Sequence, residues 1–412
     1  MGKFISFGKI NKQYKYILIH VSLILASHFI FSDAFPEQIK PNFFDIKNYP
    51  RIILVHRFFN YLGAFIFSIG FLFYQRHQTK KVKDKTVELK NNLDILHNYE
   101  LIYEKHEPVI KIKKIFFIIF LSISFYHIVN ILITIGFLGL VFWVFDLFFM
   151  SYINLLVFDI PIYSHKKFAV IFKIIFSTTF KILSTFEYIY NDKYDLIYKN
   201  HIFLIPIIII SFFLITLVRY YSLFKIKWFL DYKFIPMEFF FIIYNIVGII
   251  IFLSAALISS FIKCPDKTTL NNIDLICLIK IGDEYYFDSF SYFFQQLWNY
   301  DRTTWMNIFY LFLFIIRIIL NTFRILYFIL IIRHLSPEYY SCSYDLYYII
   351  INVIGLIKAI INKGDIKLEI YDVFAEIGSL IAILIYLEII ELNFCNLNHD
   401  LKKYIENRGN DE

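Results

Sequence analysis

A few charged and amide side chains interrupt long apolar stretches of this sequence, and their spacing matches one face of a helix. Arg317, Asn321 and Arg324 are separated by four and three residues, which places them on one helical stripe. Charged side chains at membrane depth are costly, so they tend to face the interior of a helix bundle or a water-filled cavity. A stripe with two guanidinium groups is therefore a candidate site for an anionic group of a small molecule.

Further polar residues have helical spacing or stand alone in apolar surroundings. His127 shares a face with Asn130, and Asn352 shares a face with Asp345, while Asp146 is flanked by aromatic and aliphatic residues. We interpret Asp146 as a counter-charge to the arginines or as a proton-coupling acid. The predicted substrate-binding residues are Arg317, Asn321, Arg324, Asp146, Asn352 and His127.

A purely structural role is open for each of these residues. An arginine could pair with Asp146 only to neutralise it, and Arg324 could extend its charged end toward the membrane surface. Asn245 and Asn352 are of a residue type that often forms hydrogen bonds between membrane helices. His127 could be a packed or capped histidine.

The composition indicates which elements position these residues. Of the 412 residues, 58% are hydrophobic and 18% are charged, whereas a soluble domain has about 45–50% apolar and about 25% charged residues. The apolar residues fall into runs of the length that a bilayer requires of a helix, about 20 residues. These features exclude a soluble protein and indicate a multi-pass helical membrane protein.

We predict an all-α membrane protein with ten transmembrane helices. The stretch from Ile115 to Ile160 is too long for one helix, and Gly136 with Gly139 marks a hairpin within it. The first apolar segment could also be a signal peptide, but we interpret it as a spanning helix. The predicted spans are residues 15–33, 57–75, 115–134, 137–158, 168–186, 202–221, 237–262, 307–332, 344–361 and 371–392.

The distribution of Lys and Arg orients these spans. With the N-terminus inside, the inside segments carry 24 basic residues and the outside loops carry 12, as the positive-inside rule requires. Both termini are then cytosolic, and we expect the protein in an endomembrane or the plasma membrane. Cys264 and Cys277 share one outside loop, so we expect them to form a disulfide.

Ten spans divide into two halves of five. An odd number of spans per half inverts the second half in the membrane, the arrangement from which many carriers build a central site. The predicted parts are a first five-helix repeat 1–186 with a cytosolic linker 76–114, a connecting loop 187–201, a second five-helix repeat 202–392 with a lumenal loop 263–306, and a cytosolic tail 393–412.

Two helices of this arrangement have ionisable residues along their length. Lys173, Lys181 and Glu187 indicate that the fifth span lies at the edge of the bundle or partly in the interface. The tenth span has a polar start that can pack against it, formed by Asp372, Glu376 and Ser379.

Three segments carry a resemblance to a known family. They are Phe145-Asp146-Leu147-Phe148 followed by Ile160-Pro161-Ile162-Tyr163-Ser164-His165-Lys166-Lys167, then Ser336-Pro337-Glu338 with Ser343 and Asp345, and finally Ile385-Tyr386-Leu387-Glu388. With them, the chain resembles the drug/metabolite transporter superfamily, in particular the nucleotide-sugar-transporter-related solute carriers and the chloroquine-resistance-type transporters. The resemblance implies ten helices in two inverted halves, a cavity lined by helices three, four, eight and nine, and a disulfide-bearing loop at Cys264 and Cys277.

We therefore expect a carrier that moves a small organic solute, an anion being one candidate, by alternating access. The alternatives are a structural or accessory subunit of a membrane complex and a multi-pass receptor or channel. No enzyme activity, cofactor or metal is expected, since the histidines are scattered and no catalytic motif occurs. The expected partners are the solute and the lipid bilayer, with a homodimer possible. The basic linker 76–114 fits anionic lipid headgroups and not nucleic acid.

Overall fold

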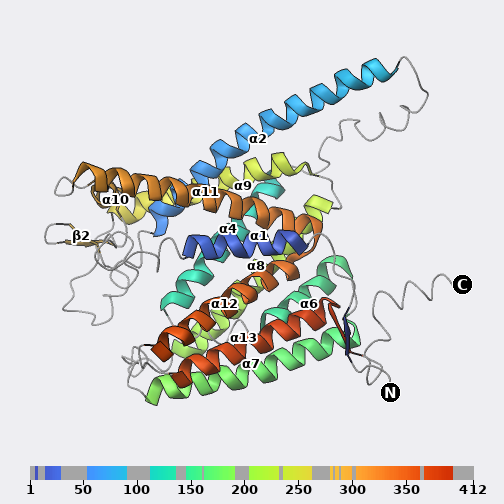
Figure 1. Cartoon of the computed structure of the whole chain (residues 1–412), viewed down its shortest axis with the longest axis vertical. Helices are drawn as coiled ribbons and strands as arrows, with labels where there is room; N and C mark the ends of the chain where they lie inside the picture. The colour runs from blue at the N-terminus through green and yellow to red at the C-terminus, as the bar shows by residue number, and fades with distance from the viewer. Residues whose placement is uncertain are drawn as a thin grey trace, which may run out of the picture. The chain divides into compact units, whose positions relative to one another are not determined.

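The computed structural model of the chain describes short strands and long helices (Figure 1). The described residues are 5–7, 14–28, 53–90, 112–135, 145–159, 162–190, 204–231, 235–261, 279–281, 284–286, 289–298, 303–361 and 366–392. The elements in chain order are β1 (Ile5–Phe7), α1 (Lys15–His28), α2 (Ile53–Lys90), α4 (Ile112–Ile135), α6 (Asp146–Phe158), α7 (Ser164–Tyr190), α8 (Leu204–Asp231), α9 (Met237–Phe261), β2 (Ile279–Ile281), β3 (Glu284–Tyr286), α10 (Phe290–Leu297), α11 (Thr304–His334), α12 (Pro337–Ile361), α13 (Ile366–Tyr386) and β4 (Ile390–Leu392).

The described residues are almost entirely helical, as the sequence predicts. Each predicted span overlaps a described helix, with α6 covering the described part of 137–158. Four helical segments are long and apolar enough to cross a membrane: Leu54–Tyr74 within α2, and the whole of α9, α11 and α12. These segments indicate a membrane-embedded protein.

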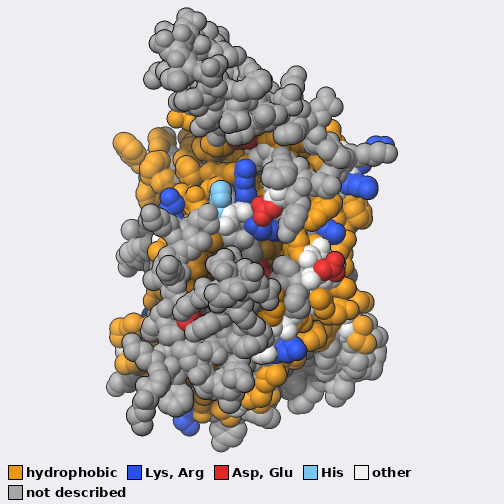
Figure 2. All heavy atoms as spheres, turned by 90° about the vertical axis from the view of Figure 1, so that its right-hand side faces the viewer, with side chains coloured by type: hydrophobic (Ala, Val, Ile, Leu, Met, Phe, Trp, Pro, Cys, Tyr) orange, Lys and Arg blue, Asp and Glu red, His pale blue; other side chains and the backbone are white. Residues whose placement is uncertain are grey.

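Large apolar side chains on the surface support the same conclusion. Ile66 on α2, Ile175 on α7 and Ile210 on α8 are each at least 60% exposed. Figure 2 shows hydrophobic side chains over much of the described surface of one face, with scattered charged groups between them. Exposed apolar surface on this scale marks contact with a membrane or another protein.

The chain divides into two compact units, each formed by segments from both halves of the sequence. The first unit comprises Met1–Leu25, Leu121–Lys227 and Leu330–Glu412, and the second comprises Ala26–Phe120 and Trp228–Ile329. The helices α1, α4, α8 and α11 contribute residues to both units.

In the first unit, α13 packs against both α7 and α12, as Figure 1 shows. Gly378 of α13 lies against the ring of Phe176 of α7, and the hydroxyl of Ser177 donates to the carbonyl oxygen of Ala375 at 3.0 Å. Further along α7, Lys181 reaches Asp372. Residue numbers rise along α7 while those of their partners fall along α13, so the two helices are antiparallel.

In the second unit, the main helix pair is α2 with α9. The ring of Tyr61 lies against Gly248 and stacks on Phe252 with centroids 5.5 Å apart. Gly63 of α2 similarly lies against Ile318 of α11. A glycine at each contact lets the helices approach closely, which is typical of helix packing in membranes.

Two of the predicted connecting segments contain secondary structure. The helix α2 continues to Lys90, so the first part of the predicted linker 76–114 is helical, because its Lys, Glu and Gln residues favour helix without needing a bilayer. The predicted loop 263–306 contains the antiparallel pair β2–β3 and the helix α10.

The tenth predicted span, 371–392, also ends earlier than expected. The helix α13 stops at Tyr386, and Glu388 adopts a left-handed conformation with φ of 60°, which commonly terminates a helix. The following residues form β4, which pairs antiparallel with β1 (Ile5 with Leu392). The segment before α1 and the segment after α13 are therefore joined.

Two of the four cysteines bear on a prediction that the structure leaves open. Cys264 and Cys277 lie outside the described residues, so their disulfide stays a prediction. Cys342 is described, and it is a buried free thiol.

Candidate functional site

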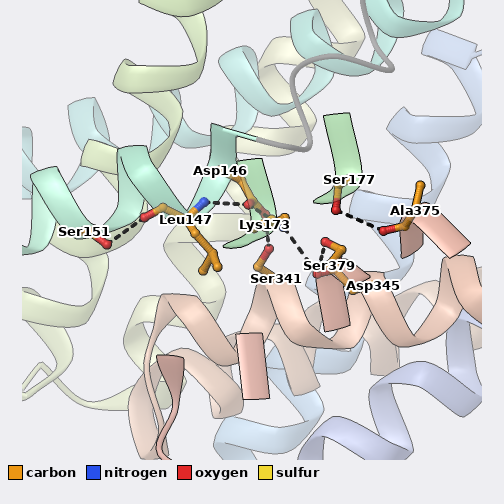
Figure 3. Close-up of polar contacts among 9 residues, drawn as sticks. All are labelled: Asp146, Leu147, Ser151, Lys173, Ser177, Ser341, Asp345, Ala375 and Ser379. Atoms are coloured by element: carbon orange, nitrogen blue, oxygen red, sulfur yellow. Dashed lines mark hydrogen bonds and ion pairs between the residues drawn. The ribbon is translucent and has the colours of Figure 1, made fainter. Parts of the chain in front are cut away.

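An ion cluster, defined by Asp146, Lys173 and Asp345, is buried in the first unit (Figure 3). Lys173 Nζ lies 2.6 Å from Asp146 Oδ1 and 3.6 Å from Asp345 Oδ2. All three residues are at most 1% exposed. The hydroxyl of Ser341 donates to Asp146 Oδ2 at 2.7 Å, and the hydroxyl of Ser379 donates to Asp345 Oδ2 at 3.1 Å. Four helices thus supply one polar cluster in apolar surroundings.

The helices position these groups in distinct ways. Asp146 is the first residue of α6, so its side chain lies at the partially positive end of that helix. The Leu147 amide donates to the same carboxylate. Ser341 and Asp345 are one turn apart on α12, so they share a face and meet neighbouring parts of the cluster.

The electrostatics of the cluster follow from its burial. Removing a charge from water costs several kcal/mol, and pairing with additional hydrogen bonds offsets that cost. Lys173 has two carboxylates within 4 Å, and each carboxylate also accepts a hydroxyl hydrogen bond. These contacts offset part of the cost of burying the cluster, which has one more carboxyl group than ammonium groups.

A second group of ion pairs joins α7 and α13. Lys181 Nζ lies 3.0 Å from Asp372 Oδ1 and 3.2 Å from Glu376 Oε1. This confirms the prediction that the polar start of the tenth span packs against the fifth. The fifth span has an exposed apolar side, with Ile175 64% exposed, while Lys173 on its buried side is 0% exposed.

The structure brings only part of the predicted site together. Asp146 belongs to the ion cluster, and its cationic partner is Lys173 rather than an arginine. His127 is buried in the first unit, with its ring edge-on to Tyr126 at 4.9 Å. Asn352 lies half-buried on α12 of the same unit.

The predicted arginine stripe lies in the second unit. Asn321 is buried, and its side-chain amide donates to the carbonyl oxygen of Arg317 at 3.0 Å within α11. Arg57 of α2 and Arg324 both act as like charges on Arg317. The stripe thus gains a third guanidinium from a neighbouring helix, which the spacing on α11 could not reveal. Asn245, expected to bond between helices, is buried, and no described residue is its hydrogen-bond partner.

Sequence reasoning missed the central member of the ion cluster. The sequence favours a position for Lys173 on a helix at the bundle edge, although a lysine within a long apolar run also indicates a buried partner. Asp345 is predicted to share a face with Asn352 and lies in a segment that carries the family resemblance, and Ser379 belongs to the polar start of the tenth span, but the sequence predicts a place in a buried ion cluster for neither. Ser341 carries no signal in sequence, since serines within a helix often bond to their own backbone.

Neither metal-binding groups among the described residues nor similar proteins add information about the function. Among the described residues, no group of three or more His, Cys, Asp and Glu side chains could hold a metal ion. The chain matches no protein-family model, no curated protein and no solved structure.

Proposed function

We propose that this protein is a membrane carrier of the drug/metabolite transporter type, which moves a small organic solute by alternating access. In this proposal it has ten transmembrane helices in two inverted five-helix repeats. Both termini are cytosolic, and the membrane is an endomembrane or the plasma membrane. The observation that carries the proposal is the buried ion cluster, whose three members come from the fourth, fifth and ninth predicted spans, with a hydrogen bond from Ser379 of the tenth. Ionisable groups inside membrane helices commonly mark solute or ion pathways.

The packing of α7 on α13 supports the inverted repeat. These helices are the last of each half, and they are antiparallel, as inverted equivalents across a two-fold axis must be. Their first residues, Ser164 and Ile366, are as far apart in sequence as Phe176 and Gly378, which are in contact. Equivalent positions therefore meet where an axis in the membrane plane would cross the pair.

The helix pairing in the second unit supports the same symmetry. The second unit combines the second span and the start of the third with the seventh span and most of the eighth. The third and eighth spans, which are equivalent, lie mostly in different units. The second and seventh spans are also equivalent, both lie in the second unit, and they form its main helix pair, α2 with α9.

The pairing of β1 with β4 supports an even number of crossings. These strands precede the first predicted span and follow the last one. Because polar backbone edges avoid the hydrocarbon core, both strands belong on one side of the membrane. An even count agrees with ten spans and with both termini in the cytosol.

Uptake by reconstituted vesicles tests the carrier function. We expect the purified chain in proteoliposomes to exchange at least one radiolabelled solute from a panel of anions, cations and neutral compounds. Lys173→Met, which removes the ammonium of the ion cluster, should abolish that exchange. Lys167→Met, at an exposed position on the same helix, is the matched control and should retain it.

Two results would oppose the proposal. Wild-type vesicles that exchange no solute on the panel, while the protein is folded and inserted, would favour an accessory subunit. Equal exchange by wild type and by folded Lys173→Met would remove the ion cluster from the transport mechanism.

A further inference from the structure

A second charged group is buried in the first unit, beside the ion cluster and distinct from it. Arg219 of α8 is 5% exposed. Its guanidinium carbon lies 5.0 Å from the centre of the Tyr126 ring and 5.5 Å from that of Tyr220. No carboxylate among the described residues pairs with it, and its Nε has no hydrogen-bond partner there. Arg219 is therefore a buried cation without a counter-anion in the described part of the chain.

The surroundings of Arg219 are polar enough to hold an anion. Its tyrosine cluster consists of Tyr126, Tyr220, Tyr340 and Tyr344, all of which interact electrostatically with the guanidinium. The hydroxyls of Tyr126 and Tyr344 lie 2.9 Å apart, and those of Tyr344 and Tyr340 lie 3.1 Å apart. Each hydroxyl has one proton, and the two hydrogen bonds of this series use two of the three protons, so at most one is left to donate to an oxyanion while both bonds are intact.

The geometry of the guanidinium favours a particular ligand chemistry. Tyrosine rings lie over Arg219, an arrangement in which the cation is attracted by the ring face. The five N–H donors of a guanidinium point outward in its plane, in a fork that matches the two oxygens of a carboxylate, sulfonate or phosphate. A stacked arginine with an unbonded Nε is thus ready to bind an oxyanion in that plane.

We infer that Arg219 and its tyrosine cluster bind the oxyanion group of a small organic molecule, which is the solute if the proposed carrier function is correct. A buried guanidinium without a counter-charge is costly, and a bound oxyanion offsets that cost. The oxyanion can belong to a free solute or to a lipid headgroup, since both present the same oxygens to the guanidinium.

One segment of α12 links this site to the ion cluster. Tyr340 and Tyr344 belong to the tyrosine cluster, while Ser341 and Asp345 bond within or beside the ion cluster. Tyr220, which carries the other ring beside Arg219, also interacts electrostatically with Asp146 and Asp345. An oxyanion at Arg219 would therefore lie beside the segment of α12 that also supplies Ser341 and Asp345 to the ion cluster.

Thermal unfolding of the full-length protein in detergent tests this inference. The probe is benzenesulfonate, an oxyanion at all relevant pH values, and the neutral benzenesulfonamide is its matched control. We expect benzenesulfonate alone to raise the melting temperature, since a ligand of the folded state stabilises it. Loss of a charge-assisted pair in Arg219→Met should weaken the apparent affinity roughly ten- to a hundredfold.

The variants separate a binding role from a structural one. Arg219→Met removes an uncompensated buried charge, so without ligand it should be at least as stable as the wild type. Arg219→Lys keeps the charge but loses the planar fork, and it should bind more weakly than the wild type. Arg333→Met, outside the tyrosine cluster, should leave the benzenesulfonate response unchanged.

Each outcome bears on the proposal. An unchanged response in Arg219→Met, or its loss in Arg317→Met alone, would overturn the inference and favour the arginine stripe of the second unit. A response to nanodiscs of phosphatidylglycerol but not phosphatidylcholine, lost in Arg219→Met, would support the site and identify a lipid headgroup as its ligand. An Arg219-dependent response without any vesicle uptake would support the site while contradicting the carrier function. Uptake without such a response would support the carrier function while contradicting the oxyanion site at Arg219.

Discussion

Lys173 has two carboxylates within reach and no exposed surface, which makes it the residue on which the ion cluster most depends. Replacement by methionine leaves Asp146 and Asp345 buried without their cation. Breaking a buried ion pair in this way typically costs about 3–5 kcal/mol. We expect Lys173→Met to lower the free energy of unfolding by about that amount, measured by chemical unfolding in detergent.

A neutral version of the same cluster provides the control. The triple variant Lys173→Met, Asp146→Asn and Asp345→Asn removes all three charges together. Since replacing a whole buried ion group by neutral residues is often close to neutral in stability, it should recover most of the loss. Equal destabilisation of the single and triple variants would mean that the lysine's packing matters and its charge does not.

Residue pairings of this kind were the part of the site hardest to predict. Asp146 is recognisable in the sequence, because a carboxylate within an apolar run demands a partner. Its partner could not be chosen from the sequence, since Lys173, Arg317 and Arg324 all lie in predicted spans. Only the packing of α6 against α7 and α12 selects Lys173, and only α8 brings Arg219 against Tyr126.

Helix contacts in this protein depend on a few glycines. At Gly378 a methyl group would meet the ring of Phe176, and that ring is itself packed between Phe172 and Phe180 with centroids 5.3 and 4.9 Å away. The ring has little room to move, so overpacking should cost about 1–3 kcal/mol. We expect Gly378→Ala to destabilise the protein by that amount in thermal or chemical unfolding.

Gly70 provides a matched control on α2. A methyl group added there meets no atom within 4 Å. Gly70→Ala should therefore be neutral or gain up to about 1 kcal/mol, because alanine favours helix more than glycine does. If Gly378→Ala and Gly70→Ala changed the free energy of unfolding equally, the close contact of α7 with α13 at Gly378 would be contradicted.

Elements were predicted well where a run of apolar residues defines them. The spans 237–262 and 344–361 end within a residue of α9 and α12, since a polar loop follows each of them. Hydropathy gave no sign that α2 would continue to Lys90, because charged residues form helix as readily as apolar ones. It gave none of β1 pairing with β4, since those partners are separated by nearly the whole chain.

The topology of the whole molecule can be read by cysteine labelling. Single cysteines at Lys83 and at Asp266, in a chain whose native cysteines are replaced by serine, should react with an impermeant maleimide from opposite sides of the membrane. The reason is that ten spans place the linker 76–114 inside and the loop 263–306 outside. Labelling of both positions from one side would contradict the ten-span topology.

The arrangement of buried charges has a consequence for energetics across the membrane. The ion cluster and Arg219 together hold two carboxylates and two cations, although Arg219 itself pairs with no carboxylate among the described residues. A monoanion bound at Arg219 would add one negative charge to this group of four side chains. Protonation of Asp345, on which Lys173, Asp146 and Glu376 act, would restore the balance. We expect an inward proton gradient to accelerate benzenesulfonate uptake into proteoliposomes, and a potassium diffusion potential to leave it almost unchanged. Uncompensated movement of one charge would alter accumulation roughly fiftyfold per 100 mV. These four side chains would thus make solute entry electroneutral, driven by acidity and insensitive to voltage.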